Sequence, residues 1–508
     1  MSIVSPMLLA FLLPVTLLLF YALGRRGGEK PALLVLLLAS LVFAQSQGWS
    51  FFALFLGSLV LNAWLVQRLA AARAGRKAFV LGVLANLAAL GIFKYANLLK
   101  LVPGGGEYAL LLGSLIPVTI SFLTFQRIAA LADAKANAEH LQGGAGTLRF
   151  AGFASFFPSL LIGPIAYLQE VLPQFRRSDF GKPRAINFAV GLTLVSIGLF
   201  KKAVLADGIG AAFVDPAWKN IGAGFAISWF DAVAASLGYM LQLYFDFSGY
   251  SDMAIGIARL FGIILPINFY SPFRATSLAD FWRRWHITLT RIVARFLFTP
   301  LSLAGTRLAA RRGWRGTPMS ALALWLPLLA NFSIIGLWHG AKPTFLLFGL
   351  LHGAWYAGEA TLAGNKRWKK RMKTLPDSLR RWAGRAILLP FLALTFSLFR
   401  APDLSAFELF AQSLASIGKM YWLTIEPDLM AVALFGFAVL TVLALPNSQE
   451  LLGRYRPGLV TYRVDSHTPA PFAWRWRPTI GWSLAIATLA AFALWHLPRA
   501  TIFSYEVF

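Results

Sequence analysis

Long apolar runs, separated by short polar or basic segments, extend along almost the whole chain. A helix needs about 20 apolar residues to cross the hydrocarbon core of a bilayer. The pattern therefore predicts an all-α polytopic membrane protein with about 11 to 13 membrane segments, some of them short or interrupted by Pro and Gly. We expect these segments near 3–23, 31–47, 50–67, 78–98, 109–131, 149–167, 187–206, 225–246, 318–337, 343–362, 385–400, 428–446 and 479–496.

The composition agrees with this pattern. Of 508 residues, 58% are hydrophobic and only 13% are charged, about half the charged share of a soluble protein. The net charge of +26 would indicate nucleic acid binding in a soluble chain. In a membrane protein, however, Lys and Arg gather in cytoplasmic loops and contact anionic headgroups. We therefore expect the lipid bilayer, and no nucleic acid, as a partner.

The basic loops also predict the orientation. Segments 25–30 and 67–77 are basic, whereas the segment 45–50 between them is uncharged. By the positive-inside rule, the N-terminus faces outward and the basic loops face the cytoplasm. The strongest basic run, 366–385, is expected to be a cytoplasmic loop. With no repeat of fixed period and no long linker, we treat residues 1–508 as one membrane domain.

Residues 278–296 contain "DFWRRWHITLTR", which is unusually polar and aromatic for this chain. Apolar residues recur here at steps of three and four, which predicts one amphipathic helix at the interface or beside a polar cavity. Asp280 and Arg284 are four residues apart and can pair. His286 falls at the edge of the apolar stripe. On periodicity alone, the pattern favours a hydrogen-bonding side chain of an interfacial helix over a catalytic residue.

Other polar residues interrupt apolar runs. Asp246, Ser248 and Asp252 lie in "YFDFSGYSDMAIG", where Gly249 is expected to allow a bend. Carboxylates at membrane depth are costly and tend to face cavities or partners. His339 ends one apolar run beside the helix break at 340–343, and His352 lies within the next run. For His339 a structural role and a catalytic role fit the pattern equally, and for His352 the pattern favours a structural hydrogen bond.

The sequence lacks the residues or motifs that several classes of catalytic and metal-binding site require. The chain has no cysteine, which excludes disulfides, thiolate metal sites and cysteine nucleophiles. The histidines lack the close spacing of metal ligands, so we expect no metal site. No GxSxG segment is present either, which argues against a serine hydrolase of that class.

The order "PVTISFLTFQ", "FFPSLLIGPIAYLQEVLPQF", "GLFKKAVLADGI", "YFDFSGYSDMAIG", "FWRRWHITL" and "GLWHGA" resembles the membrane-bound O-acyltransferases, and within them the branch of the bacterial alginate O-acetyltransferase. The resemblance implies a ring of tilted helices around a tunnel, with a core at about 117–362. It implies that His339 is the catalytic histidine and His286 a second catalytic residue. The chain departs from the usual pattern at Ala294 and Phe298, where polar or aromatic residues are common.

The same resemblance implies a function in a bacterial inner membrane with a periplasmic N-terminus. An acyl group, most simply acetyl from acetyl-CoA, would cross from a cytoplasmic thioester to an exported polysaccharide or cell-wall glycan. A periplasmic acyltransferase and the polysaccharide export machinery are the expected partners, and no permanently bound cofactor is expected. Further contacts to tunnel or substrate are expected from Asp246, Ser248, Tyr250, Asp252, Trp282, Arg283, Trp285, Asn331, Trp338 and His352.

Two alternatives remain at this stage. Within the family, the chain could serve D-alanyl transfer toward teichoic acid, although it is longer than we expect for that reaction. From another class, a secondary transporter or flippase would also combine broken helices with polar residues in the membrane. Transporters often contain inverted repeats, and we find none.

If the chain is an acyltransferase, a buried and therefore neutral His339 would act as general base. His286 would orient His339, contact the thioester oxygen or bind the acceptor, and the arginines of 283–295 would meet headgroups or coenzyme A phosphates.

Overall fold

The computed structural model describes residues 2–72, 75–95, 120–417, 425–461, 472 and 474–497. Within these residues every regular element is helical, and helical turns of other pitch are labelled η. The N-terminal part contains η1 (Leu8–Leu12), α1 (Leu13–Gly27), α2 (Glu29–Gln45), α3 (Trp49–Ala70), α4 (Arg76–Lys94), α6 (Ile120–Asp133), η3 (Lys135–Asn137), α7 (Ala138–Leu141), α8 (Gly143–Ser155), α9 (Phe157–Leu160) and α10 (Leu168–Phe175).

The middle of the chain supplies the elements that surround the site. They are α11 (Ala185–Phe200), η4 (Lys201–Ala206), α12 (Asp207–Ile209), η5 (Gly210–Val214), α13 (Asp215–Gly222), α14 (Trp229–Leu260), η6 (Pro272–Arg274), α15 (Leu278–Arg284), α16 (Ile287–Val293), η7 (Ala294–Phe298), α17 (Thr299–Arg311), α18 (Thr317–Ser320), η8 (Ala321–Trp325), α19 (Leu326–His339) and α20 (Pro343–Gly364).

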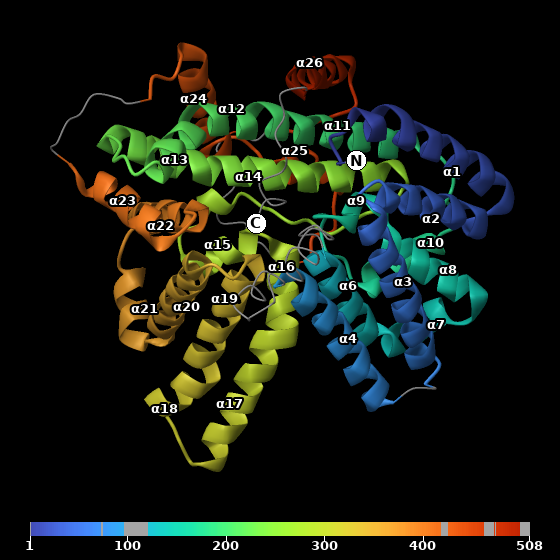
Figure 1. The fold of residues 1–508 in the computed structure, drawn as a ribbon, viewed down its shortest axis with the longest axis horizontal. Coiled ribbons are helices and arrows are strands. Elements are labelled where there is room, and N and C mark those ends of the chain that lie inside the picture. The colour runs from blue at the N-terminus through green and yellow to red at the C-terminus, as the bar shows by residue number, and fades with distance from the viewer. Residues whose placement is uncertain are drawn as a thin grey trace, which may run out of the picture.

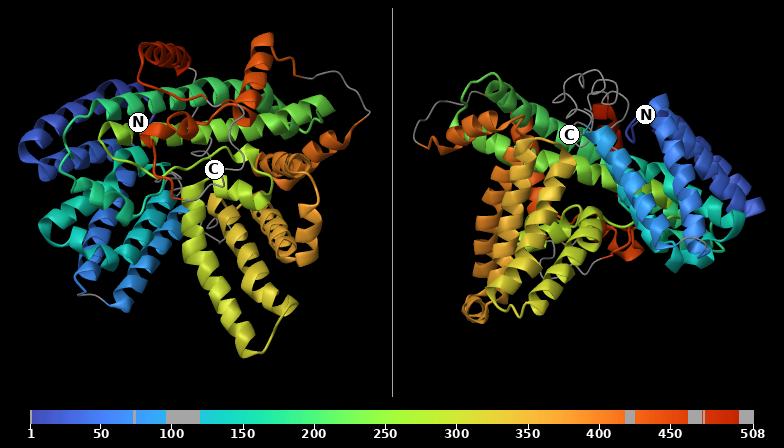
Figure 2. Two further views of the ribbon diagram at one scale, coloured as in Figure 1. Left: turned by 180° about the vertical axis from the view of Figure 1, so that it is seen from behind. Right: turned by 60° about the horizontal axis from the view of Figure 1, so that its bottom comes forward.

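The C-terminal part contains α21 (Lys366–Lys373), α22 (Asp377–Arg400), α23 (Leu404–Ala415), α24 (Leu429–Leu443), α25 (Ser448–Leu451), η9 (Gly453–Tyr455) and α26 (Ile480–His496). Figure 1 shows α11 and α14 side by side across the top of the view. The α17, α19 and α20 helices lie below them on one side, and α3, α4 and α6 lie on the other. The views of Figure 2 show the same division from behind and from below.

The long helix α14 is almost entirely buried and forms the centre of the molecule. Glycines let it approach α11 closely: a Cβ at Gly249 would lie 2.8 Å from the carbonyl oxygen of Gly198, and one at Gly256 would lie 2.7 Å from that of Gly191. Small residues at such crossings allow membrane helices to pack at short range. The α14 helix continues without a break through Gly249, where we expected a bend, and this glycine allows close packing against α11.

Seven helices of the described residues are long and apolar enough to cross a membrane. The protein is thus an all-α polytopic membrane protein, as the sequence predicts. The predicted segments 318–337 and 385–400 fall within two of these helices, Thr317–His339 and Asp377–Arg400. The count of 11 to 13 membrane segments stays a prediction, because it includes helices shorter than the seven above. Residues 109–119 of one predicted segment also lie outside the described residues.

Two predicted segments have different ends in the structure. The segment 149–167 is not one helix, because α8 ends at Ser155, α9 is a single turn, and residues 161–167 are outside any helix. The segment 225–246 is only the first part of α14. The sequence analysis also missed the apolar helix Ile287–Arg311, since its arginines made this stretch look interfacial.

Candidate active site

The predicted helix 278–296 is broken where its histidine stands. The α15 helix ends at Arg284, Trp285 is extended, and His286 adopts φ +46° and ψ +50°. This left-handed conformation is uncommon for a residue other than glycine. Backbone bonds hold the break, because Tyr270 donates to the carbonyl of Arg284 (3.0 Å) and Ile287 donates to that of Asn268 (2.9 Å). The prediction of one continuous helix was therefore wrong.

The break places His286 in one cavity with His339, although the two residues are 53 positions apart (339 − 286). Both imidazoles are buried, with exposed fractions of 1% for His286 and 7% for His339. The cavity measures about 20 Å³, which is room for about one water-sized group. It is lined by Leu243, Trp282, Trp285, His286, Leu289, Ile335, His339, Phe348, Phe396 and Phe399.

Aromatic rings surround the two histidines. The ring of Trp338, the residue before His339, lies 4.6 Å from the ring of His339 and 6.2 Å from that of His286. Phe399 approaches His339 edge-on at 4.8 Å. The ammonium of Lys94, at the end of α4, lies 5.3 Å from the centre of the Trp338 ring. Lys94 was not among the residues predicted for the site.

His286 is anchored by a side chain that the sequence analysis also missed. Its Nδ1 lies 3.1 Å from Oδ1 of Asn268, a fully buried residue in the extended segment after α14. The same oxygen accepts hydrogen bonds from the backbone N–H (3.3 Å) and the hydroxyl (2.9 Å) of Thr288. The Nδ2 group of Asn268 donates to Ser251 of α14 at 3.3 Å. Asn268 therefore ties the broken turn to the central helix.

His352 has a different environment. The indole N–H of Trp282 donates to its Nδ1 (3.1 Å), and its Nε2 lies 3.0 Å from the hydroxyl of Thr395. That hydroxyl donates to the carbonyl of Phe391 (2.9 Å), so it accepts from His352. Both ring nitrogens thus serve hydrogen bonds within the protein. His352 has the structural bonds that the sequence pattern favoured, and it holds Trp282, which lines the cavity.

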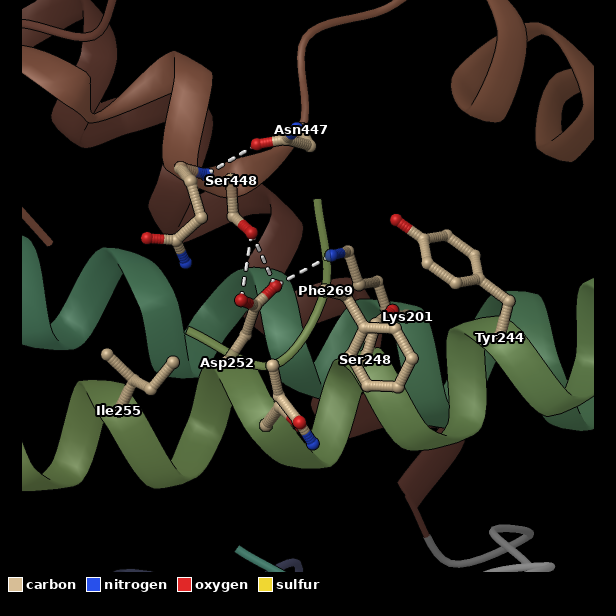
Figure 3. A pocket seen from close by; sticks show the side chains of 11 residues that line it. Lys201, Tyr244, Ser248, Asp252, Ile255, Phe269, Asn447 and Ser448 are labelled. Atoms are coloured by element: carbon tan, nitrogen blue, oxygen red, sulfur yellow. Dashed lines mark hydrogen bonds and ion pairs between the residues drawn. The ribbon is translucent and has the colours of Figure 1, made fainter. Parts of the chain in front are cut away.

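The carboxylates of α14 form buried ion pairs. Lys201 Nζ lies 2.6 Å from Oδ2 of Asp252, whose carboxylate also accepts from the hydroxyl of Ser448 (Figure 3). Lys202 Nζ lies 2.7 Å from Asp246 and 2.9 Å from Asp207. Neither aspartate lines the cavity of the two histidines in the described structure. Buried charges are tolerated where they pair with an opposite charge. Pairing with the two lysines therefore explains how Asp246 and Asp252 can be buried in an apolar helix.

A small polar pocket of about 10 Å³ lies beside the pair of Lys201 and Asp252 (Figure 3). Its lining includes Ser248 and Ser251 of α14 together with Asn268. Asn268 also contacts His286, so one hydrogen bond joins a residue of this pocket to a residue of the histidine cavity. Ser248 thus lines this pocket rather than the histidine cavity.

The remaining predicted contacts lie outside the described lining of the histidine cavity. The hydroxyl of Tyr250 accepts from the backbone N–H of Ile162 (3.4 Å). Asn331 is buried on α19. Arg283 is 39% exposed at its side chain and pairs with Asp280 at 3.4 Å.

The arginines near the broken turn pair with carboxylates of the protein. Arg284 joins Asp280 at 3.0 Å, as the spacing predicted. Arg291 pairs with Glu170, and Arg295 pairs with Asp133. We expected these arginines to meet lipid headgroups or coenzyme A phosphates. In the described structure they pair with carboxylates of the protein, and the expected contacts stay a prediction. In the described ranges, no three His, Asp or Glu side chains converge as a metal site would require, and the absence of a metal stays a prediction.

Comparison with known proteins places this arrangement in a family. The sequence profile described as "MBOAT, membrane-bound O-acyltransferase family" matches residues 78–400. That range is more than half of the chain and includes both cavity histidines. The chain belongs to the membrane-bound O-acyltransferase family. Its membership confirms the resemblance that was read from the sequence motifs.

Several curated relatives align with part of this chain. The peptidoglycan O-acetyltransferase of Helicobacter pylori is 36% identical over 326 residues, or 58% of this chain and 61% of that protein. The probable alginate O-acetylase of Pseudomonas aeruginosa is 36% identical over 346 residues, or 65% and 62%. The teichoic acid D-alanyltransferase of Bacillus subtilis is 28% identical over 184 residues, or 35% and 45%. The chain thus spans about three-fifths of the length of the first two relatives.

Proposed function

We propose that this member of the membrane-bound O-acyltransferase family transfers an acyl group, most simply acetyl, to a hydroxyl of an exported polysaccharide or cell-wall glycan. The observation that carries this proposal is the shared, buried cavity of His286 and His339. The names of the two relatives at 36% identity support an acetyl group and a glycan acceptor. We take acetyl-CoA or a related thioester as the donor, bound from the cytoplasmic side.

His339 is the proposed general base of this reaction. It takes the proton from the acceptor hydroxyl while the oxygen attacks the carbonyl carbon of the thioester. A carbon–oxygen bond forms, the carbon–sulfur bond breaks, and the thiolate leaves with the proton that His339 returns. A positioned base of this kind contributes roughly 10²–10⁴-fold to the rate. The buried position of His339 suits this role, because burial disfavours the charged imidazolium.

The aromatic shell supports the same chemistry. Trp282, Trp285 and Phe399 line the cavity and leave space for about one water-sized group. Exclusion of bulk water protects a thioester from hydrolysis and strengthens electrostatic interactions within the site. We propose that the acceptor arrives from the outer side of a bacterial inner membrane, where a periplasmic acyltransferase and the export machinery would act with this protein.

D-alanyl transfer toward teichoic acid is the second candidate. The aligned D-alanyltransferases of Bacillus subtilis and Streptococcus thermophilus support it. Their alignments cover 35% and 36% of this chain, against 58% and 65% for the two acetyl-transferring relatives. The longer alignments favour O-acetylation. A transporter or flippase is the candidate of another class, and it would move a glycan or lipid without cleaving a thioester.

The deciding experiment uses the purified full chain in nanodiscs with labelled acetyl-CoA and a polysaccharide acceptor. We expect release of free thiol and labelled O-acetyl ester, reduced about 10²–10⁴-fold by His339→Ala. His496→Ala, at the end of α26 and far from the cavity lining in sequence, is the matched control and should leave turnover unchanged. Unchanged turnover in His339→Ala would remove His339 from the mechanism. Turnover of a D-alanyl thioester alone would favour the second candidate, and no thioester cleavage would favour a transporter.

A further inference from the structure

The hydrogen bonds of Asn268 determine which of its side-chain atoms is the oxygen. The atom that faces His286 also faces the backbone N–H of Thr288 at 3.3 Å. A backbone N–H is always a donor. If the NH₂ group of Asn268 stood at this position, two donors would face each other and no hydrogen bond could form. The hydroxyl of Thr288 accepts from the backbone N–H of Ile165 (3.2 Å) and gives its own hydrogen to the same atom of Asn268 (2.9 Å). The atom is therefore Oδ1.

An amide oxygen can only accept, so Nδ1 of His286 carries a hydrogen and donates it to Asn268. A neutral imidazole has one N–H, which leaves the lone pair on Nε2. Asn268 lines the small polar pocket and does not belong to the described lining of the histidine cavity, whereas His286 lines that cavity. Nε2 is thus the nitrogen through which His286 can accept a hydrogen bond from a group in the cavity that it lines.

We propose that Asn268 is a positioning residue that fixes His286 as a hydrogen-bond acceptor toward the cavity. This inference rests on the proposed function. It excludes one of the three roles left open for His286, because a neutral ring with its lone pair on Nε2 does not donate to a thioester oxygen. Of the two roles that remain, orienting His339 and binding the acceptor, the proposal takes the second. A lone pair there suits a hydroxyl, so His286 holds a hydroxyl of the acceptor. A glycan carries several hydroxyls, and His286 can hold one while His339 takes the proton of the reacting one.

His352 provides an internal contrast. It accepts at Nδ1 from Trp282 and donates from Nε2 to Thr395, which is the opposite tautomer. The protein therefore fixes two buried histidines in different forms through their partners. Such partners commonly decide which nitrogen of a histidine carries the proton. Asn268 does this for the histidine that faces the cavity.

The first test measures the tautomer directly. Nitrogen NMR of the ¹⁵N-histidine-labelled full chain, with His286 assigned by its loss in His286→Gln, should show hydrogen on Nδ1 and a lone pair on Nε2. The Asn268→Ala variant should lose that signature. A wild-type His286 with its hydrogen on Nε2 would overturn the inference. This readout needs no catalysis, so it fails or succeeds independently of the proposed function.

The second test compares acceptor and donor kinetics. Asn268→Ala should raise the KM for the acceptor by roughly tenfold, the value of about one hydrogen bond, and leave the KM for acetyl-CoA unchanged. Ser251→Ala removes only the Nδ2 contact and is the matched control, with kinetics near those of the wild type. An equal rise in both KM values would indicate a merely structural role and would contradict the proposal.

The third test uses Asn268→Asp, which keeps an acceptor at Oδ1 and so also guards against misfolding of Asn268→Ala. The added carboxylate stabilises imidazolium, so the acidic limb of the pH–rate profile should move to higher pH, with activity restored on the alkaline side. Charged or titratable groups near His286 among the described residues include His339 in the same cavity, Lys94 beyond the ring of Trp338, and the pair of Lys201 and Asp252 beside Asn268. These groups are unchanged in the variant. An unmoved acidic limb would contradict the proposal.

Discussion

The indole of Trp282 on α15 and the imidazole of His352 on α20 are joined by a hydrogen bond of 3.1 Å. Trp282 lines the cavity that contains His286 and His339, whereas His352 lies outside its described lining and bonds to Thr395 with its second nitrogen. His352 thus holds Trp282, a residue of the cavity wall, in place. Both of its ring nitrogens are engaged in hydrogen bonds, so neither is available for proton transfer.

His352→Leu should therefore act on stability first. It leaves the buried N–H of Trp282 without its acceptor, which costs about 1–3 kcal/mol. We expect a lower melting temperature of the detergent-purified protein and a smaller loss of acyl transfer than in His339→Ala. A loss of transfer equal to that of His339→Ala, at an unchanged melting temperature, would instead give His352 a direct part in the reaction.

The two lysines at the start of η4 lead to a second prediction. Lys202 contacts both Asp246 and Asp207, and its side chain is fully buried. Lys202→Met would leave these carboxylates without their counter-ion, and breaking a buried pair from one side costs about 3–5 kcal/mol. We expect little folded protein in the membrane, measured by fluorescence-detected size exclusion.

The double variant Lys202→Met with Asp246→Asn should recover part of this loss, because it removes one of the stranded charges. Arg380→Met is a suitable control, since it breaks the exposed pair with Asp377 and should change stability by less than about 1 kcal/mol. Equal amounts of folded protein in all three variants would show that the buried pairs are not needed for folding.

The contact between α11 and α14 supports a third prediction. Gly249→Leu forces a side chain toward the carbonyl oxygen of Gly198, which lies 2.8 Å from an ideal Cβ. The helices would have to separate, so we expect a clear drop in thermal stability. Gly436→Leu is the control, because nothing lies within 4 Å of a Cβ there. A similar melting temperature for both variants would refute the close crossing.

The sequence predicts local features of this fold well. The α19 helix and its end at His339 follow from an apolar run and the break after it, and both are properties of neighbouring residues. The left-handed turn at His286 could not be predicted in this way, because it depends on Asn268, 18 residues earlier in the chain. Periodicity describes one helix face and contains no information about a partner in another segment.

The same reason explains the polar residues of α14. Asp252 was identified as unusual, but its partners are Lys201, 51 residues earlier, and Ser448, 196 residues later. These partners account for the burial of its charge, and its contact with a tunnel or substrate stays a prediction. The family motifs supplied His286 and His339 as a pair, which residue spacing alone did not. The position of Lys94 near His339 likewise follows from packing of α4 against the site.

The orientation in the membrane gives a fourth prediction, and the absence of cysteine makes it simple to test. The exposed α21 helix carries six Lys or Arg residues, and by the positive-inside rule it faces the cytoplasm. A single cysteine at Lys369→Cys should react with a membrane-impermeant maleimide only after the cells are opened. Ser50→Cys, in the first turn of α3 and at the end of the uncharged segment 45–50, should react in intact cells. The cysteine-free parent chain controls for labelling of other proteins. Reaction of both positions from the same side would contradict the orientation, because the α2 to α3 connection and α21 would then share one face of the membrane.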